Sequence, residues 1–471
     1  MRNAFALVLA LWVMLATSTP FSAARAQGGA GALVTVRDAE TEGLLRAIAH
    51  PLFRVAGVDP ALVRMTLIQA RPINAFVTTG NRLFINTGLI QQSAGAGDLA
   101  GVLAHETGHI AGGHVARLPE EMRNAMLRSL AGMLLGGAAA AAGGGGGAAA
   151  AGMLGGQAMA QGELFAFSRA QEQAADQAGM TFLDRLGWSG SGLRRLLLRM
   201  QEQEMLTVGR QDPYLRTHPL SRDRLEFVTD WVERAGAARG DAGLPAGLEA
   251  AFLMVRAKLD GFIDPPLSTW RRYGENDGSA PARYARAIAQ HRSGRADAAL
   301  GLLDGLVREQ PSNPWLRELQ GQVLFEAGRV AEAVGPLREA ARLAPGEALV
   351  RLALGRALME AGDPALLRAA AAELEASLRI ERENAFAWRQ LAVAQGRLGL
   401  AAQADLALAE EAMLVGDFPA VRTLAQRAEA ALPPGPLRLR AADLRHAAQR
   451  DNMTREQREQ EREAMRRRPR P

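Results

Sequence analysis

Three histidines and one glutamate fall within the twelve residues LAHETGHIAGGH, from Leu103 to His114, in a chain that has only seven histidines. The surrounding apolar residues recur with helical spacing, which predicts a helix from Leu99 to Arg117. His105 and His109 are four residues apart, so both imidazoles project from the same face of that helix. Two imidazoles at this spacing can chelate one Zn²⁺ ion.

Glu106 directly follows His105 in the helix, beside the coordination position that a three-ligand zinc site leaves open. There its carboxylate can take a proton from water and deliver it to a leaving amine. The alternative, a chance pattern, is disfavoured by the low histidine content of the chain. His114 follows a helix-weakening Gly-Gly pair and lies nine residues past His105. On a straight helix it points to the opposite side, which favours a place behind the ligands or at the surface over a metal ligand.

A zinc site needs a third protein ligand, and the helical stretch FSRAQEQAADQAGMTFL, Phe167 to Leu183, is the best candidate to supply it. Glu172 and Asp176 are four residues apart there and face the same way. One such carboxylate can bind zinc while the other accepts a hydrogen bond from a ligand imidazole. The alternative is a solvated charged face, in which Arg169 and Glu172 form an ordinary pair three residues apart. Periodicity alone does not decide between the two.

The elements that position these residues are mixed. Residues 34–63 predict an N-terminal helix, whereas MTLIQA and NAFVTTGNRLFINTGLI alternate as strands do, with Gly80 and Asn81 as a hairpin turn. Asp98 follows the loop SAGAG and is a candidate N-cap of the histidine helix. This order of elements predicts an α+β domain.

The first residues predict export. A short basic MRN segment, an apolar run from Ala4 to Thr17 and the tripeptide Ala24-Arg25-Ala26 are typical of a signal peptide over residues 1–26, cleaved after Ala26. The alternative is a membrane anchor, but the apolar run is shorter than the ~20 residues that a spanning helix needs. A chain without cysteine suits an oxidising extracytoplasmic compartment, because it has no thiol to oxidise.

Composition bounds the remaining possibilities. A chain of 471 residues predicts two or three domains. A net charge of +5 on so large a chain does not argue for nucleic acid, and we expect no nucleic-acid partner.

The stretch 129–162 has no charged residue and is split by Gly143 to Gly147 into two arms, each too short to span a bilayer. We interpret it as a helical hairpin beside the active site; the alternatives are a mobile lid or a hairpin that contacts a membrane or a barrel client.

The C-terminal half is repetitive. Glycines recur at intervals of 34 residues, at Gly294, Gly328 and Gly362, and prolines at the same interval, at Pro311 and Pro345. This is the tetratricopeptide period, in which paired helices stack into a solenoid with a concave binding surface. We place a connector with one helix at 237–280, the repeats at 281–432 and a charged helix or tail at 433–471. Unrelated alanine-rich helices are the alternative, and the coincident glycine and proline periods disfavour it.

The motif H-E-x-x-H followed by S-R-x-x-E-x-x-A-D resembles the gluzincin metalloprotease family that includes HtpX and the CAAX-prenyl proteases. The matching residues are His105, Glu106, His109, Ser168, Arg169, Glu172, Ala175 and Asp176. The stretch from Ile73 is similar to the family's edge-strand region, and THPLSRDRLEF to its downstream element with His218, Pro219 and Arg224. With repeats after such a domain, the chain resembles the BepA-like periplasmic β-barrel assembly-enhancing proteases.

This resemblance implies one Zn²⁺ per chain, held by His105, His109 and Glu172, with Glu106 as general acid and base. It implies that Asp176, His218 and Arg224 support or regulate the site. An edge strand near Asn74, Ala75 and Phe76 would hold the substrate backbone as an added β-strand.

His218 has three possible roles. It precedes Pro219, which favours an extended or turn conformation in a loop. It can act as a latch that fills the open zinc position, and the resemblance favours this role. It can instead stabilise the oxyanion of the transition state, or be a loop histidine bonded to nearby backbone.

We therefore predict an α+β gluzincin metalloprotease domain over residues 34–236, followed by an all-α tetratricopeptide-repeat solenoid. The resemblance implies a periplasmic metalloendopeptidase whose clients are unfolded or stalled envelope proteins, with the repeats contacting the outer-membrane assembly machinery. The alternative is a chaperone or assembly adaptor in which proteolysis is minor. The intact H-E-x-x-H motif together with Glu172 favours retained catalysis, since an adaptor has no need of Glu106.

Overall fold

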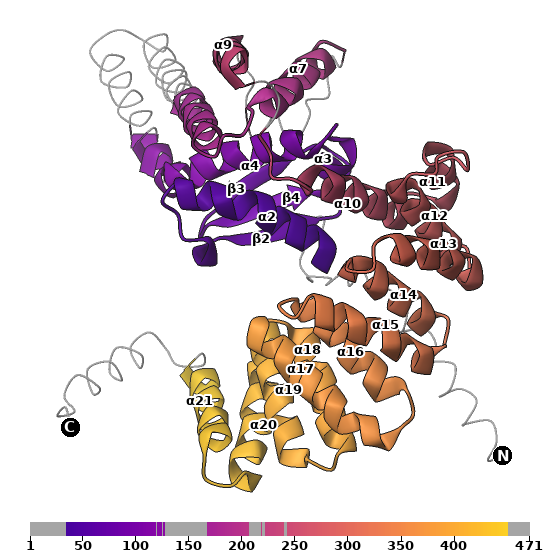
Figure 1. Cartoon of the computed structure of the whole chain (residues 1–471). Helices are drawn as coiled ribbons and strands as arrows, with labels where there is room; N and C mark the ends of the chain where they lie inside the picture. Colours follow the sequence, from indigo (N-terminus) through magenta and orange to yellow (C-terminus); the bar gives the residue numbers. More distant parts are fainter. Residues whose placement is uncertain are drawn as a thin grey trace, which may run out of the picture. The chain divides into compact units, whose positions relative to one another are not determined.

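The computed structural model describes residues 34–118, 120–124, 126–127, 167–206, 218, 222–239 and 243–450. The predicted signal peptide, the uncharged stretch 129–162 and the end of the tail lie outside these ranges. The described chain forms two compact units that divide between Ala285 and Arg286 (Figure 1). Among the described helices, none has both the length and the apolar character that a membrane span requires.

The first unit contains a four-stranded sheet with the order β1-β2-β4-β3. Its strands are β1 Thr35–Val36, β2 Arg64–Ile68, β3 Ala75–Thr78 and β4 Arg82–Asn86. β2 and β4 pair in parallel, and the other two pairs are antiparallel. The predicted hairpin is confirmed: β3 and β4 are joined through Gly80 and Asn81, which both have positive φ. In the described part of the chain, β3 is therefore an edge strand.

One face of this sheet forms the core of the unit. Leu67, Leu83 and Ile85 alternate along their strands toward the same side and are buried. Two helices cover that side, α2 Ala39–Val55 and α4 Ala96–Ala111, and their apolar residues belong to the same core cluster. The sheet thus supports α4, the helix that carries the H-E-x-x-H motif.

Further helices of this unit are α3 Thr87–Gln92, a helix over residues 167–185, α7 Ser191–Leu206, α9 Arg222–Arg239, α10 Leu248–Ile263, α11 Pro266–Arg272 and the first part of α12 Ala280–Arg292, up to Ala285. α4 begins earlier than predicted, with Gly95 as N-cap, so the expectation that Asp98 is the N-cap is wrong. Asp98 lies in the first turn, where its carboxylate accepts a hydrogen bond from the Ala94 N–H at 2.8 Å and pairs with Arg195 at 2.8 Å.

α10 is part of the first unit and not a loose connector. Phe252, Val255 and Leu259 on this helix are buried in the core cluster that contains the sheet and α4. The Glu249 carboxylate accepts a hydrogen bond from the Ala96 N–H at 2.8 Å, at the N-terminus of α4. The sequence predicted that the domain ends at residue 236 and that this helix lies in a connector over residues 237–280. The described unit instead continues to Ala285, because the core needs the apolar face of α10.

Buried charges also join α10 to the first helix. Lys258, the only lysine in the chain, lies 2.5 Å from Asp38 and 3.3 Å from Glu40. The Tyr284 hydroxyl donates a hydrogen bond to Glu40 at 2.8 Å. Removing one member of such a buried network leaves an uncompensated charge, which typically costs about 3–5 kcal/mol. These contacts fix residues 248–285 to α2.

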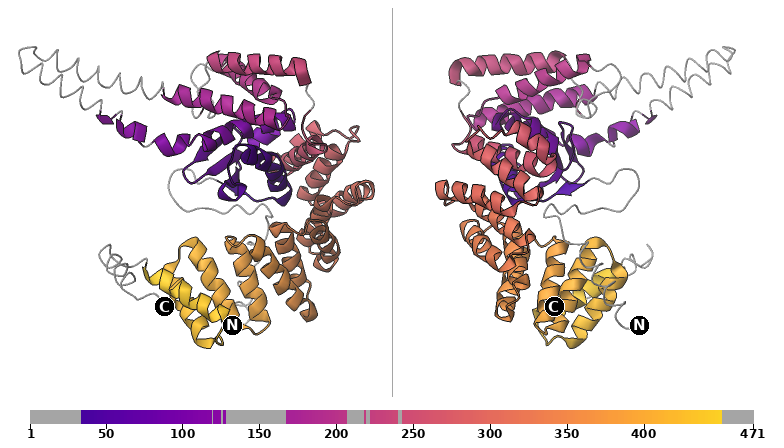
Figure 2. Two further views of the ribbon diagram at one scale, coloured as in Figure 1. Left: turned by 60° about the vertical axis from the view of Figure 1, so that its left-hand side comes forward. Right: turned by 90° about the vertical axis from the view of Figure 1, so that its right-hand side faces the viewer.

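The second unit is all helical. Its helices are α13 Ala296–Glu309, α14 Pro314–Glu326, α15 Val330–Leu343, α16 Ala348–Glu360, α17 Leu367–Ile380, α18 Ala385–Arg397, α19 Ala401–Val415, α20 Phe418–Ala431 and α21 Pro436–Arg450. They follow one another as stacked pairs, as the orange-to-yellow part of Figure 2 shows. The predicted helical repeat region is confirmed. α21 extends the packing beyond residue 432, since Leu444 and Ala448 are buried against α20 and α19.

The glycines of the repeat have two different functions. Gly294, Gly328 and Gly362 have φ of 76–78°, a left-handed conformation at the turns between helices that glycine adopts without strain. Within the helix pairs, a Cβ on Gly321 would come within 2.4 Å of Leu337, and one on Gly355 within 2.8 Å of Leu374. These two positions therefore require a residue without a side chain at the helix crossing.

Candidate active site

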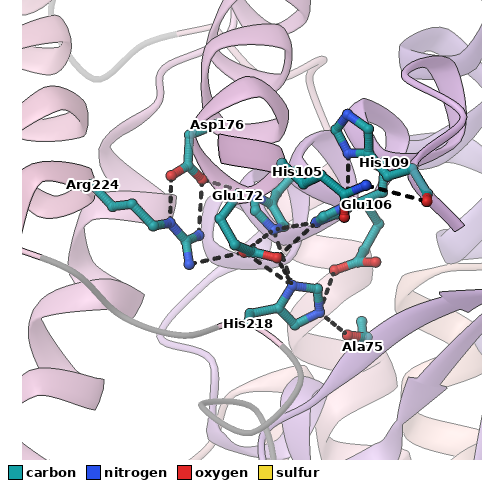
Figure 3. A network of polar contacts seen from close by, with 10 residues as sticks. Ala75, His105, Glu106, His109, Glu172, Asp176, His218 and Arg224 are labelled. Carbon is teal, nitrogen blue, oxygen red and sulfur yellow. Dashed lines mark hydrogen bonds and ion pairs between the residues drawn. The ribbon is translucent and has the colours of Figure 1, made fainter. Parts of the chain in front are cut away.

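Three segments bring the predicted site residues together (Figure 3). α4 carries His105, Glu106 and His109, and the helix over residues 167–185 carries Glu172 and Asp176. The two helices approach closely because α4 has a glycine at position 108: a Cβ there would lie 2.6 Å from the Ala175 carbonyl oxygen. His218 comes from just before α9, and Arg224 from its first turn.

Four candidate ligands converge at one point. The donor atoms of His105, His109, Glu172 and His218 all lie within 4.8 Å of one another, and all four residues are buried. The Nε2 atoms of His105 and His109 are 3.1 Å apart, and each lies 3.3 Å from a Glu172 oxygen. The charged-face alternative for Glu172 and Asp176 is wrong, because their exposed fractions are 3% and 0%.

Asp176 and Arg224 support this cluster from behind. The Nδ1 atom of His105 lies 2.7 Å from the Asp176 carboxylate, so its N–H donates to Asp176 and its Nε2 faces the cluster. The Arg224 Nε donates to the other Asp176 oxygen at 2.7 Å, and its Nη1 pairs with Glu172 at 2.9 Å. The guanidinium thus holds the two carboxylates in a fixed relation to each other.

His114 lies behind His109, one of the two places that the sequence favoured over that of a metal ligand. Its Nδ1 is 3.0 Å from the Nδ1 of His109, and the side chain is buried. The straight-helix projection fails because α4 ends at Ala111 and the chain turns at Gly113, where φ is 62°. The Gly-Gly pair in the sequence was the signal for this change of direction. His114 can therefore orient the imidazole of His109 from the side opposite the ligand cluster.

The electrostatics of the cluster are strongly perturbed. Burial lowers the pKa of His105, but the carboxylates of Asp176 and Glu172 outweigh it and raise that pKa to about 10. Burial lowers the pKa of His109 to about 3. Burial raises the pKa of Glu172, but hydrogen bonds from the three surrounding histidines outweigh it and hold that pKa far below its usual range. Glu172 is therefore an ionised carboxylate among imidazoles, which is the charge pattern of a cation site.

Glu106 has a different environment from Glu172. It is completely buried, and among the described residues neither carboxylate oxygen has a hydrogen-bond partner. The His218 Nε2 lies 3.3 Å from one of these oxygens. Burial raises the pKa of Glu106, so that this carboxyl group is a better proton acceptor than an exposed one. A buried carboxylate without a hydrogen-bond partner, beside a cluster of nitrogen and oxygen donors, fits a site that takes zinc and water.

The edge strand reaches this cluster through His218. The His218 Nε2 lies 3.2 Å from the Ala75 carbonyl oxygen, and its Nδ1 lies 3.2 Å from Glu172 (Figure 3). Asn74 turns its backbone toward β4, since its carbonyl oxygen accepts the Asn86 N–H at 2.9 Å. The backbone N–H and C=O groups of Ala75, the next residue, therefore point to the open edge of the sheet. The sequence indicated His218 and this strand as separate features, and it did not predict their contact.

Comparison with known proteins gives a consistent result. The model of "Peptidase family M48" matches residues 39–232. The "Beta-barrel assembly-enhancing protease" of Yersinia pestis is 27% identical over 58% of this chain and 56% of its own length. Its namesake in Escherichia coli K12 is 26% identical over 59% of this chain and 56% of its own length. The chain thus spans a little over half the length of these relatives.

Two further likenesses are more partial. A "Mitochondrial metalloendopeptidase" of Schizosaccharomyces pombe is 27% identical over 40% of this chain and 52% of its own length. A crystal structure of MamA aligns with 35% of this chain and 92% of its own, at TM-score 0.28 and 18% identity. The family match covers every residue of the ligand cluster, which all lie between His105 and His218. Residues 39–232 of this chain are therefore similar to the peptidases of family M48.

Proposed function

We propose that this protein is an exported zinc-dependent metalloendopeptidase that acts on unfolded or stalled envelope proteins in the periplasm. The observation that carries this proposal is the buried Glu106 carboxylate, which has no hydrogen-bond partner among the described residues, beside the convergent donors of His105, His109 and Glu172. A purely structural metal site has no use for such a carboxylate, because it costs free energy to bury it without partners.

His105, His109 and Glu172 would hold one zinc ion. When bound, zinc supplies a Lewis acid that makes water more acidic and polarises a peptide carbonyl. Glu106 is placed to take the proton from that water and to pass it to the leaving amine, since its raised pKa favours holding the proton between the two steps. Asp176 and Arg224 keep His105 and Glu172 oriented throughout.

The edge strand β3 supplies the place for the substrate backbone. Its Ala75 carbonyl oxygen lies next to the cluster and on the open edge of the sheet. An extended peptide can add to such an edge as a further strand, which binds main chain without demanding a sequence. This mode suits clients that are unfolded, because only an unfolded segment is free to extend along the edge.

We assign His218 the role of a latch. Its Nδ1 shares the ligand cluster, and its Nε2 contacts both Ala75 and Glu106. It therefore occupies the place of the nucleophilic water and of the substrate backbone together, and must leave before a peptide binds. The oxyanion-stabilising role predicts the opposite effect on activity, and a merely structural loop histidine predicts none.

The latch is tested with zinc-loaded His218→Ala. We expect faster cleavage of a model substrate and more self-cleavage than in wild type. A loss of oxyanion stabilisation would instead lower the rate by roughly 10²-fold or more. A decreased or unchanged rate in the folded variant would therefore contradict the latch.

The proposed enzyme and the adaptor alternative differ in one measurement. Full-length protein with bound zinc is incubated with casein, with and without a chelator. We expect cleavage that the chelator stops and added zinc restores. Binding of unfolded casein without any cleavage would favour the chaperone or adaptor.

The relatives named β-barrel assembly-enhancing proteases support outer-membrane proteins as clients and the repeats as the surface that contacts their assembly machinery.

A further inference from the structure

Two stacked phenylalanines lie beside the edge where a substrate strand would add. Phe76 on β3 and Phe84 on β4 are directly opposite in register, with ring centroids 5.2 Å apart and ring planes 22° from parallel. Both rings are half-buried, and neither belongs to the core cluster of this unit. They therefore lie on the face of the sheet opposite α2 and α4.

The alternation of β3 confirms this placement. Ala75 and Val77, the residues on either side of Phe76, point their side chains into the core. Thr66 of β2 lies opposite Phe84, so that one row across the outer face runs from Thr66 through Phe84 to Phe76 and ends at the open edge. A substrate strand added to β3 would extend this row by one side chain.

The backbone pattern fixes how close that side chain comes. Asn74 and Asn86 form a hydrogen-bonded pair, so hydrogen-bonded and non-hydrogen-bonded pairs alternate from there, and Phe76 turns its backbone toward β4. Toward an antiparallel substrate strand, Phe76 therefore forms a non-hydrogen-bonded pair. In such pairs the side chains lie closest, with Cα atoms about 4.5 Å apart.

This position is next to the reacting peptide bond. A single atom, the His218 Nε2, lies 3.2 Å from the Ala75 carbonyl oxygen and 3.3 Å from the Glu106 carboxylate. A substrate residue that pairs with Ala75 in place of His218 would therefore lie next to the Glu106 carboxylate. The residue paired with Phe76 is its immediate neighbour along the substrate.

We propose that Phe76 and Phe84 form a selectivity platform that favours an aromatic or branched apolar side chain at the substrate residue paired with Phe76. The inference rests on the proposed peptidase function. The substrate class is a strand-forming segment with an apolar residue beside the scissile bond, because cross-strand aromatic pairs are more stable than pairs with alanine. The backbone of β3 binds any extended chain, whereas the platform selects where along that chain cleavage occurs.

The test uses the zinc-loaded full chain and a mixture of synthetic peptides with randomised residues, whose cleavage products are sequenced by mass spectrometry. We expect enrichment of aromatic and branched apolar residues at one position within two residues of the cleaved bond. A preferred peptide and its counterpart with alanine at that position are then compared by kcat/KM. We expect a ratio of roughly fivefold for wild type.

The variants separate selectivity from a general loss of activity. Phe76→Ser should reduce the ratio to about one, because the ring that favours the apolar residue over alanine is gone, and Phe76→Tyr should keep the ratio. Leu62→Ser, at an exposed apolar residue of the same unit, is the matched control and should leave the ratio unchanged. Equal ratios in wild type and Phe76→Ser would overturn the platform alone. No cleavage of any peptide by wild type would overturn the proposed function and the platform with it.

Discussion

Asp176 is the residue on which the geometry of the site depends most. It accepts hydrogen bonds from His105 on one side and from Arg224 on the other, and it is completely buried. Burial raises the pKa of Asp176, but Arg224 and His105 outweigh it and hold that pKa below its usual range. The carboxylate is therefore ionised and fixes the His105 tautomer that presents Nε2 to the metal.

We predict that Asp176→Asn weakens zinc binding without removing a ligand. An amide accepts a weaker hydrogen bond from His105, and loss of such a partner typically costs 10–100-fold in metal affinity. Zinc affinity is measured by competition with a chromophoric chelator. Glu120→Asn, at an exposed acid, is the control and should bind zinc as wild type does. Wild-type affinity in Asp176→Asn would show that Asp176 does not orient the ligand.

The sequence predicted more of the site's residues than of their spatial relations. His105 and His109 were named because the i, i+4 spacing fixes which side chains share a helix face. Periodicity left Glu172 open between a ligand and a charged face, and the family resemblance favoured the ligand. The contact of His218 with Ala75 joins residues 143 positions apart, and no local pattern encodes it. The place of His114 depended on the backbone conformation at Gly113, which a straight-helix projection ignores.

At the level of elements, α10 shows the same limit of sequence reasoning. Its own residues predicted a helix, but not that its apolar face completes the core around α4. Glu249 accepts from the Ala96 N–H, so this helix also stabilises the N-terminus of α4, where a negative charge is favourable. Packing between distant segments decides domain boundaries, whereas composition only indicates linkers.

Two shortened chains test whether α10 belongs to the peptidase unit. A chain that ends at residue 237 lacks Phe252, Lys258 and the rest of α10. We expect it to unfold at a lower temperature and to bind zinc poorly, because it leaves Asp38 and Glu40 buried without Lys258. A chain that ends at Ser293 keeps α10 and α12 and should bind zinc normally. Equal melting temperatures and zinc contents in both chains would contradict this role of α10.

At the scale of the whole molecule, the ligand cluster lies in only one of the two units. Every residue of the ligand cluster precedes Ala285, and the stacked helices from α13 to α21 contain none of them. Stacked helical repeats present an extended surface that suits protein partners. We therefore expect the first unit to catalyse peptide cleavage and the second unit to bind protein partners.

The chain that ends at Ser293 also tests this division. We predict that it cleaves casein as the full chain does, because casein is an unfolded substrate that needs no docking. It should no longer co-purify with the envelope proteins that the full chain retains, as judged by mass spectrometry of crosslinked complexes. Retention of the same partners by the shortened chain would place recruitment in the first unit instead.

The central claim is that Glu106 transfers protons in a site where His105, His109 and Glu172 hold zinc. The most direct test is to measure zinc content and casein cleavage in the same preparations of wild type and Glu106→Gln. We predict about one zinc per chain in both proteins, with cleavage reduced at least 10²-fold in Glu106→Gln, because the amide cannot accept the proton. Cleavage by zinc-loaded Glu106→Gln at the wild-type rate, or wild-type protein that binds no zinc, would contradict the account.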